Sequence, residues 1–403
     1  MTTAVVTGVG VVGSFGCGLN ALAEALRASR PVLVEVDRAA GYHLPESART
    51  AALIGAADLT AWVPPASARR MSPPSKLAVA AARMATEEAG GDGEAGLTEV
   101  VLATAFGPAS FTERMLRGLL AEGPGTASPF LFTECVANAP AAQVAIAGQA
   151  RGPNITVTQR EAGPLLALGR AAADVATGSV ERALTGAADE SPPLVHALLD
   201  RYRALSRPGA DGGEAARPFD RRRSGFCLGE GATVLVVEEE AAARTRGARI
   251  LARVRAWGSA FDPSASRVSW GCGHEPLARA ARRMLDRASL APSDIDLVVS
   301  GASGSVAGDR LEAATLHALW GEAPLPPVLA PKSVTGEYGG AQLGAAILAT
   351  AGAEFGPTAG FETFDPELRV IPHAGGPLPL PRRVLVSSLA GGGAAAWVVL
   401  ERP

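Results

Sequence analysis

The chain has 403 residues, of which 47% are hydrophobic and 19% charged, so it can bury a sizeable core. Its 37 lysine and arginine residues against 40 aspartate and glutamate residues give a net charge of −3, which excludes the basic footprint of a nucleic-acid-binding protein. No apolar run is long enough to span a membrane, and the first residues lack the pattern of a signal peptide. We therefore expect a cytoplasmic protein with no membrane or nucleic-acid partner.

The cysteines do not form a recognisable framework. The sequence contains four of them, scattered and without a Cys-x-x-Cys pair, at positions 17, 135, 227 and 272. This pattern argues against disulfides and against a zinc site, and we expect no metal.

Short β-branched runs and Ala/Leu/Arg-rich runs alternate along the chain. The first predict buried strands at residues 4–7, 100–104, 155–158, 232–237, 296–300 and 384–387. The second predict helices at residues 20–28, 74–89, 163–177, 275–287, 310–320 and 341–351. Such alternation predicts an α/β protein with helices packed on sheets. Residues 206–216 form the least structured stretch, and a break near Arg246 divides the chain into residues 1–246 and 247–403.

Gly8, Gly10 and Gly13 fit a G-x-G-x-x-G pattern after an apolar strand, and Glu35 and Asp37 lie at roughly the distance that a dinucleotide site requires. However, residues 14–18 continue the loop, and the helix begins only near residue 20. The pattern therefore favours glycines that permit close packing over nicotinamide binding, and we expect no cofactor.

Four segments resemble the β-ketoacyl synthases. Residues 217–239 (RPFDRRRSGFCLGEGATVLVVEE) are similar to that family's signature, as are residues 151–158 (RGPNITVT), 307–313 (AGDRLEA) and 331–336 (PKSVTG). The segments follow the family's order and cover nearly the whole chain. The resemblance implies a thiolase-like fold, in which two similar α/β halves form a five-layered αβαβα arrangement, and a dimeric assembly.

The chemistry of that family requires a cysteine that is acylated at a helix N-terminus and two histidines that stabilise an enolate. By motif spacing, the cysteine position holds Glu161, and the two histidine positions hold Gly301 and Glu337. The five histidines of the chain stand outside the matching motifs, at positions 43, 196, 274, 317 and 373. The isolated chain is therefore not expected to catalyse condensation by the family's mechanism.

The resemblance also identifies residues that are retained. Lys332 and Glu312 keep the family's positions, and we expect either a buried pair between them or a surface pair of little energetic value. Residues 387–393 align with a gating loop whose phenylalanines are missing here. Glu161 is interpreted mainly as an anion that caps the following helix, because proline follows at 164. As an ionised group at a position where relatives carry glutamine, it would repel a malonyl carboxylate.

Residues 111–124 (FTERMLRGLLAEGP) and 160–163 (REAG) are similar to chain-length factors, the β subunits of type II polyketide ketosynthases. By that resemblance Ala109, Thr112 and Leu116 occupy the gate that closes the acyl tunnel. Their i, i+3, i+7 spacing places them on one helical face. The small residues predict room for a long chain, although phenylalanines at 106, 111, 130 and 132 could refill that space.

The main hypothesis is a non-catalytic ketosynthase β subunit. It would form a heterodimer with an active ketosynthase α subunit and shape the tunnel for a polyketide carried by an acyl carrier protein. One alternative is a malonyl-carrier decarboxylase or atypical condensing enzyme that uses Glu161. Another is a catalytically silent homodimer that binds a carrier protein. Arginines at residues 221–223 and 279–283 could contact an acidic carrier protein, or simply form a solvated face.

Overall fold

The computed structural model describes residues 2–55, 58–91, 97–208 and 213–403. The first part of the chain contributes five strands to the main sheet: β1 (Ala4–Gly13), β5 (Thr98–Ala103), β6 (Asn154–Val157), β7 (Arg182–Asp189) and β8 (Gly231–Glu239). Its longer helices are α1 (Leu19–Ala28), α3 (Pro73–Glu88), α4 (Ala109–Glu122), α6 (Ala139–Ala147), α7 (Gly163–Ala176) and α8 (Pro193–Arg201). Shorter elements are β2 (Gly16–Cys17), β3 (Val34–Glu35), β4 (Thr50–Ala51), α2 (Pro65–Ala68), α5 (Pro129–Glu134), α9 (Glu240–Thr245) and a 3₁₀ turn at Pro124–Thr126.

The second part of the chain contributes five more strands: β9 (Ala252–Phe261), β10 (Leu297–Val299), β11 (Val328–Leu329), β12 (Arg383–Leu389) and β13 (Ala394–Glu401). Its helices are α10 (His274–Arg287), α11 (Val306–Trp320), α12 (Lys332–Thr335) and α13 (Ala341–Thr350), with a 3₁₀ turn at Pro292–Asp294.

The strand order repeats. It is β6-β5-β7-β8-β1 in the first part and β11-β10-β12-β13-β9 in the second. If the five strands of each part are numbered by their order in the chain, both parts follow the order third, second, fourth, fifth, first. In each part the first two pairings are parallel and the next two antiparallel. A short pairing of β1 with β9, at Val5↔Arg253 and Val6↔Ala252, joins the two sheets. The repeated topology makes the two parts structurally alike.

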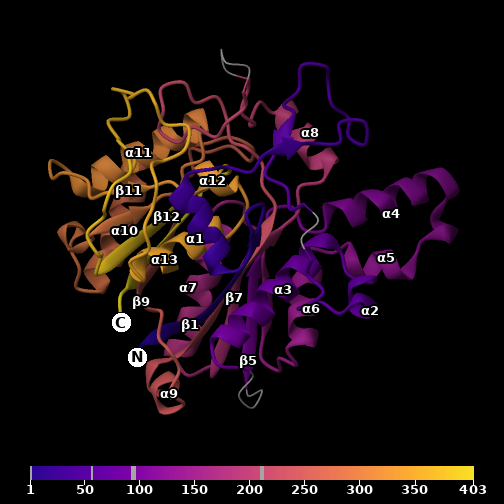
Figure 1. Ribbon diagram of the computed structural model, residues 1–403, viewed down its shortest axis with the longest axis horizontal. Helices are drawn as coiled ribbons and strands as arrows, with labels where there is room; N and C mark the ends of the chain where they lie inside the picture. The colour runs from indigo at the N-terminus through magenta and orange to yellow at the C-terminus, as the bar shows by residue number, and fades with distance from the viewer. Residues whose placement is uncertain (1, 56–57, 92–96, 209–212) are drawn as a thin grey trace.

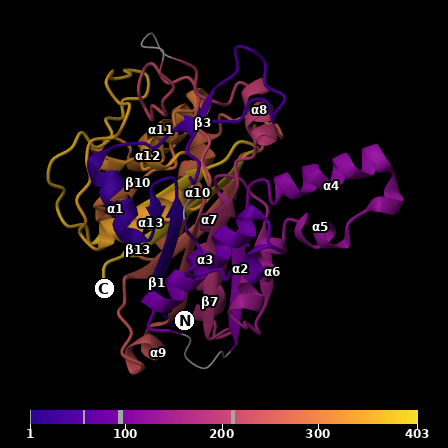
Figure 2. The same cartoon turned by 45° about the vertical axis from the view of Figure 1, so that its right-hand side comes forward.

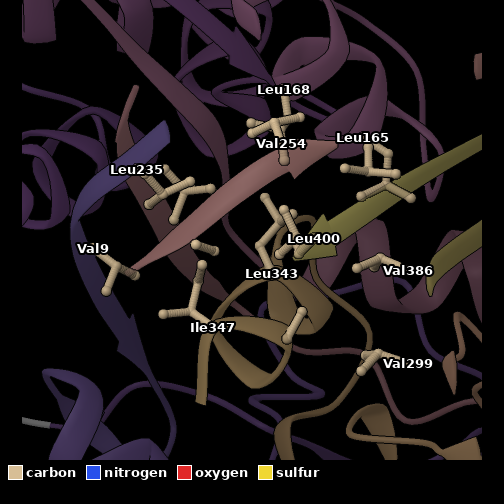
Figure 3. Close-up of a cluster of buried hydrophobic side chains, with 14 of the residues drawn as sticks. Val9, Leu165, Leu168, Leu235, Val254, Val299, Leu343, Ile347, Val386 and Leu400 are labelled. Carbon is tan, nitrogen blue, oxygen red and sulfur yellow. The ribbon is translucent and has the colours of Figure 1, made fainter. Parts of the chain in front are cut away.

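Helices cover both outer faces and fill the middle (Figure 1). α3 and α6 pack on the first sheet, α10 and α11 on the second, and α7 and α13 lie between the sheets. The central core takes side chains from both parts, as Figure 3 shows for Val9, Leu165, Leu235, Leu343 and Leu400. The predicted five-layered arrangement is confirmed. In the described residues no helix is long and apolar enough to cross a membrane.

The glycine pattern near the N-terminus belongs to a strand, because β1 continues through Gly13. A Cβ atom on Gly8 would overlap the carbonyl oxygen of Ala85 in α3, and one on Gly10 would overlap that of Ala81. The glycines therefore allow β1 and α3 to approach closely. The packing interpretation agrees with this geometry, and the dinucleotide-loop interpretation is wrong.

Each predicted strand and helix overlaps an element of the same type, with ends that differ by a few residues. Some elements were not predicted, among them the strands β7, β9 and β13. In β9 the side chains alternate between buried and exposed, and several exposed positions are polar. Of the predicted loop at 206–216, residues 209–212 lie outside the described residues, and the rest forms no helix or extended strand.

α4 and α5 extend away from the body of the molecule as an arm, which we define as residues 109–134 (Figures 1 and 2). No residue of α4 is fully buried. The most exposed apolar side chains of the arm are Leu120 at 88%, Phe130 at 72% and Phe132 at 59%. This large uncovered apolar surface is typical of an interface rather than of a free surface.

Candidate functional site

A pocket lies where the end of β7, the start of α7 and the segment after α12 come together. Its empty volume, including the open mouth, is about 700 Å³. Acidic side chains on its wall are Glu161, Asp189, Glu190 and Glu337, and Arg160 is the one guanidinium there. The structure thus brings together Glu161 and Glu337, two of the three positions where the sequence departs from the condensing enzymes.

Glu161 stands two residues before the first residue of α7. Ala162 is the N-cap residue, and no side chain caps the helix. Oε2 of Glu161 is enclosed and has no hydrogen-bond partner. Burial raises the pKa of Glu161 to about 7, and the nearby Glu337 anion adds to this, against the opposing charge of Lys332. The expected role of Glu161 as a helix cap is not seen, because no side chain caps α7, and its raised pKa favours the neutral acid.

Lys332 begins α12 and forms an ion pair with Glu337, with 2.6 Å between Nζ and Oε1. The Lys332 side chain is 1% exposed and that of Glu337 is 10% exposed, so the pair is removed from water. Oε2 of Glu337, like that of Glu161, has no partner. A buried pair of this kind is costly to break, because removal of one partner strands the other charge.

Glu312 on α11 is also buried, but it accepts a hydrogen bond from Ser300 Oγ at 3.0 Å. The ion-pair partner of Lys332 is thus Glu337 rather than the expected Glu312, and the alternative of a surface pair is wrong. Gly301 lies against Ser387 and Ser388 and borders a small cavity beside Glu312. This cavity adjoins the Glu161 pocket, because Trp270 lines both and the Ser388 hydroxyl donates to the carbonyl of Glu161.

Two acidic residues of the pocket were not identified from the sequence. Asp189 ends β7 and accepts hydrogen bonds from Thr104 Oγ1 (2.9 Å), Ala105 N (2.7 Å) and Gly339 N (2.8 Å). Glu190 accepts from Ser110 N at 2.9 Å and from Ser110 Oγ at 2.6 Å, and burial raises its pKa to about 7. The sequence does hold a signal for these two residues, because two acidic residues stand side by side where an apolar strand ends.

The three gate positions lie on α4 but do not line the pocket. The hydroxyl of Thr112 is within hydrogen-bond distance of the carbonyl of Cys135 at 3.0 Å. Leu116 is 52% exposed, and Ala109 packs near a small core cluster. Of the phenylalanines expected to refill the tunnel, Phe106 lines the pocket. Any tunnel along α4 would thus need walls from another molecule.

Among the described residues that line the pocket, none is cysteine, serine, threonine or histidine. Cys135 directly follows the arm, and its thiol contacts Leu131 O. Cys227 is buried, and burial raises the pKa of its thiol to about 12, which keeps it protonated. No group of three or more metal-ligating side chains occurs in the part of the chain that the structure describes.

Two arginines of the first arginine-rich segment, residues 221–223, form ion pairs within the molecule. Arg222 pairs with Asp220 and Glu362, and the buried Arg223 pairs with Asp365 at 2.5 Å. Arg223 is therefore held inside the molecule, whereas Arg221 and Arg222 are exposed. On α10, Arg279 and Arg283 are exposed as well.

Comparison with known proteins agrees with the fold and the motifs. The family model of the β-ketoacyl synthase N-terminal domain matches residues 1–243, and that of the C-terminal domain matches residues 251–353. Granaticin polyketide putative beta-ketoacyl synthase 2 of Streptomyces violaceoruber is 32% identical over 366 residues, which cover 86% of this chain and 83% of the relative. Beta-ketoacyl synthase 1 of the same granaticin set and organism is 31% identical over 416 residues, covering 99% and 98%. The solved structure of the ishigamide ketosynthase/chain length factor superposes with a TM-score of 0.90 at 29% identity, covering 100% of this chain and 99% of the other.

Proposed function

The chain belongs to the β-ketoacyl synthase family, and from that premise we propose that it is the non-catalytic subunit of a type II polyketide synthase, a chain-length factor. It would pair with an active ketosynthase and end the tunnel that holds a polyketide growing on an acyl carrier protein. The observation that carries the proposal is the pocket wall, where Glu161 and Glu337 stand in place of a thiol and an imidazole.

The chemistry of the pocket supports a non-catalytic subunit. Transfer of an acyl group from a carrier thioester requires a nucleophile that forms a new thioester, and decarboxylation of malonate requires donors that stabilise the enolate. Carboxylates beside a buried ammonium supply neither a thiolate nor neutral imidazole donors. The reacting groups would therefore come from the partner.

Two surfaces support a partner of the same fold. The arm exposes Leu120, Phe130 and Phe132, and none of the described residues covers them. β6 is the edge strand of the sheet, and its residues are only partly buried or exposed. An open sheet edge and an uncovered apolar arm are each costly for a free monomer, whereas obligate interfaces bury such surfaces.

The direct test is native mass spectrometry of the chain expressed alone and together with a ketosynthase encoded beside it. We expect a 1:1 complex on co-expression. The double substitution Leu120→Asp with Phe130→Asp should abolish the complex, because it places two charges in the apolar interface. Ile371→Asp is the matched control, since Ile371 is 63% exposed but lies outside the arm, and it should leave the complex intact.

Two results would overturn the proposal. One is a homodimer that ignores the ketosynthase. The other is decarboxylation of a malonyl carrier by the isolated chain, if Glu161→Ala abolishes that turnover. The second result would instead support an enzyme that uses Glu161.

A further inference from the structure

The four carboxyl groups on the pocket wall fall into two kinds. Asp189 and Glu190 have hydrogen-bond donors from the backbone and from hydroxyl groups, so they hold the local structure together. Glu161 and Glu337 each keep one oxygen, Oε2, that is enclosed and without a partner. The Glu337 side chain is only 10% exposed, so water reaches this oxygen poorly. Such orphan acceptors are costly in a folded protein unless a ligand supplies donors.

The charge of the wall restricts the kind of ligand. Four carboxyl groups face two positive charges: the guanidinium of Arg160, whose Nη2 donates to Arg267 O at 3.1 Å, and the ammonium of Lys332, which is paired with Glu337. An anion such as a free carboxylate or a phosphate would be repelled. A metal ion is a poor fit, because no group of three or more ligating side chains is present among the described residues. A small organic cation with several N–H donors satisfies both the charge and the orphan oxygens.

The rest of the wall is apolar and aromatic. Phe106, Phe226 and Trp270 line it together with Leu199 and Leu228. Aromatic faces attract a cation and also bury the hydrocarbon part of a ligand. The pocket therefore combines acceptors for a charged head group with a hydrophobic wall for a compact body.

We propose that this pocket binds a primary ammonium group attached to a small apolar or aromatic body, with the ammonium donating to Oε2 of Glu161 and Oε2 of Glu337. This ligand class lies beyond the role in chain-length control, which depends on the arm and the gate. Loss of the ketosynthase complex and loss of amine binding are thus separate outcomes of separate experiments.

The test is isothermal titration calorimetry at pH 8 on the full-length chain, in complex with its ketosynthase if the two co-purify. The probe is 2-phenylethylamine, compared with 2-phenylethanol as the neutral analogue and 3-phenylpropionate as the anionic one. We expect the amine to bind at least about tenfold more tightly than the alcohol, and the carboxylate to show no binding, because only the amine forms charge-assisted hydrogen bonds.

Glu161→Gln should weaken amine binding at least about tenfold, since it removes the negative charge and keeps the shape. Glu367→Gln is the matched control, because the Glu367 side chain is 74% exposed and lies outside the pocket, and it should bind like the unmodified chain. If the ketosynthase complex is used, weaker amine binding in Glu161→Gln shows that the amine binds in this pocket and not in the active site of the partner. Equal affinity for the three probes, no amine binding up to millimolar concentration, or an unchanged affinity in Glu161→Gln would overturn the proposal.

A second readout is the pH dependence of binding, compared between the unmodified chain and Glu161→Gln, because Glu190 on the same wall also has a pKa raised to about 7. The charged groups that face Glu161 are Glu337, Lys332 and Arg160, and the pKa of Glu161 is about 7 in the empty pocket. The ammonium of the probe stays charged from pH 6 to pH 8, whereas Glu161 loses its proton over that range. Affinity should therefore rise several-fold from pH 6 to pH 8. An affinity that is flat or falls with pH, or a rise of the same size in Glu161→Gln, would contradict a role for Glu161.

Discussion

Glu161 illustrates how two local effects compete at one residue. Its position just before α7 favours the anion, because the helix N-terminus carries partial positive charge. Burial and the neighbouring Glu337 act in the opposite direction and prevail, raising the pKa of Glu161 to about 7. Near neutral pH a fraction of this side chain is thus a neutral acid, similar in shape and charge to the glutamine of the resembling proteins.

This raised pKa predicts a pH-dependent cost to stability. Between the unfolded pKa of about 4.5 and the folded pKa of about 7, the folded chain holds a proton that the unfolded chain has released. The contribution of Glu161 to stability is therefore favourable at low pH and is lost as pH rises through this window. Glu161→Gln should abolish this decrease in stability. The free energy of unfolding of the variant, minus that of the parent chain, should be roughly 1–3 kcal/mol larger at pH 8 than at pH 5.

The measurement is urea denaturation of both chains at the two pH values, with Glu367→Gln as the control. The comparison uses the difference between variant and parent, because Glu190 and Asp309, whose pKa values burial also raises to about 7, contribute to both curves equally. A variant whose stability follows pH in the same way as the parent would show that Glu161 is not the group responsible.

At the scale of elements, α4 is a helix that extends away from the body of the molecule. The gate positions Ala109, Thr112 and Leu116 share one face of the helix, as the spacing predicts, but the helix extends into solvent instead of closing a tunnel. Ser110 ties the start of α4 to Glu190 on the pocket wall. The base of the helix is thus held to the body of the molecule, whereas no residue of α4 is fully buried.

If α4 ends the tunnel in the complex, a bulky residue on its gate face should shorten the product. Leu116→Phe, alone or with Ala109→Phe, should shift the polyketide made by the reconstituted synthase toward fewer extender units, as measured by mass spectrometry of the released chains. Ala121→Phe adds the same ring to the other face of the helix, since residues advance by about 100° each. A shift that is equal in both variants would argue against the gate.

At the scale of the whole molecule, the two parts of the chain share one central core. α7 of the first part and α13 of the second pack between the sheets, and Leu165, Leu343 and Leu400 contribute to the same cluster. We propose that the boundary between the parts lies at residues 246 and 247, between α9 and β9. Neither part would bury its inner face without the other.

Separate expression of residues 1–246 and 247–403 tests this interdependence. Each fragment alone should be insoluble or lack a cooperative unfolding transition, because the inner faces of its sheet and middle helix would be exposed to water. Co-expressed fragments should co-purify and unfold together, as measured by size-exclusion chromatography and calorimetry. A soluble, cooperatively folded first fragment would contradict the shared core.

Much of the architecture could be predicted from the sequence. Hydrophobic periodicity placed the predicted strands and helices, because the repeats of a strand and a helix depend only on nearby residues. The motifs at residues 151–158 and 331–336 allowed counting to Glu161 and Glu337, since motif spacing is also a local property. The prediction that the thiol and the imidazoles are replaced therefore needed no structure.

The partners of those residues depended on the tertiary structure. Lys332 pairs with Glu337 and not with Glu312. Glu161 lies near Lys332 and Glu337, although about 170 residues separate it from them in sequence. Asp189 and Glu190 reach the same wall from β7. Contacts over such separations are decided by how sheets and helices stack, because an element's own periodicity sets which face is buried but not which distant side chain it meets.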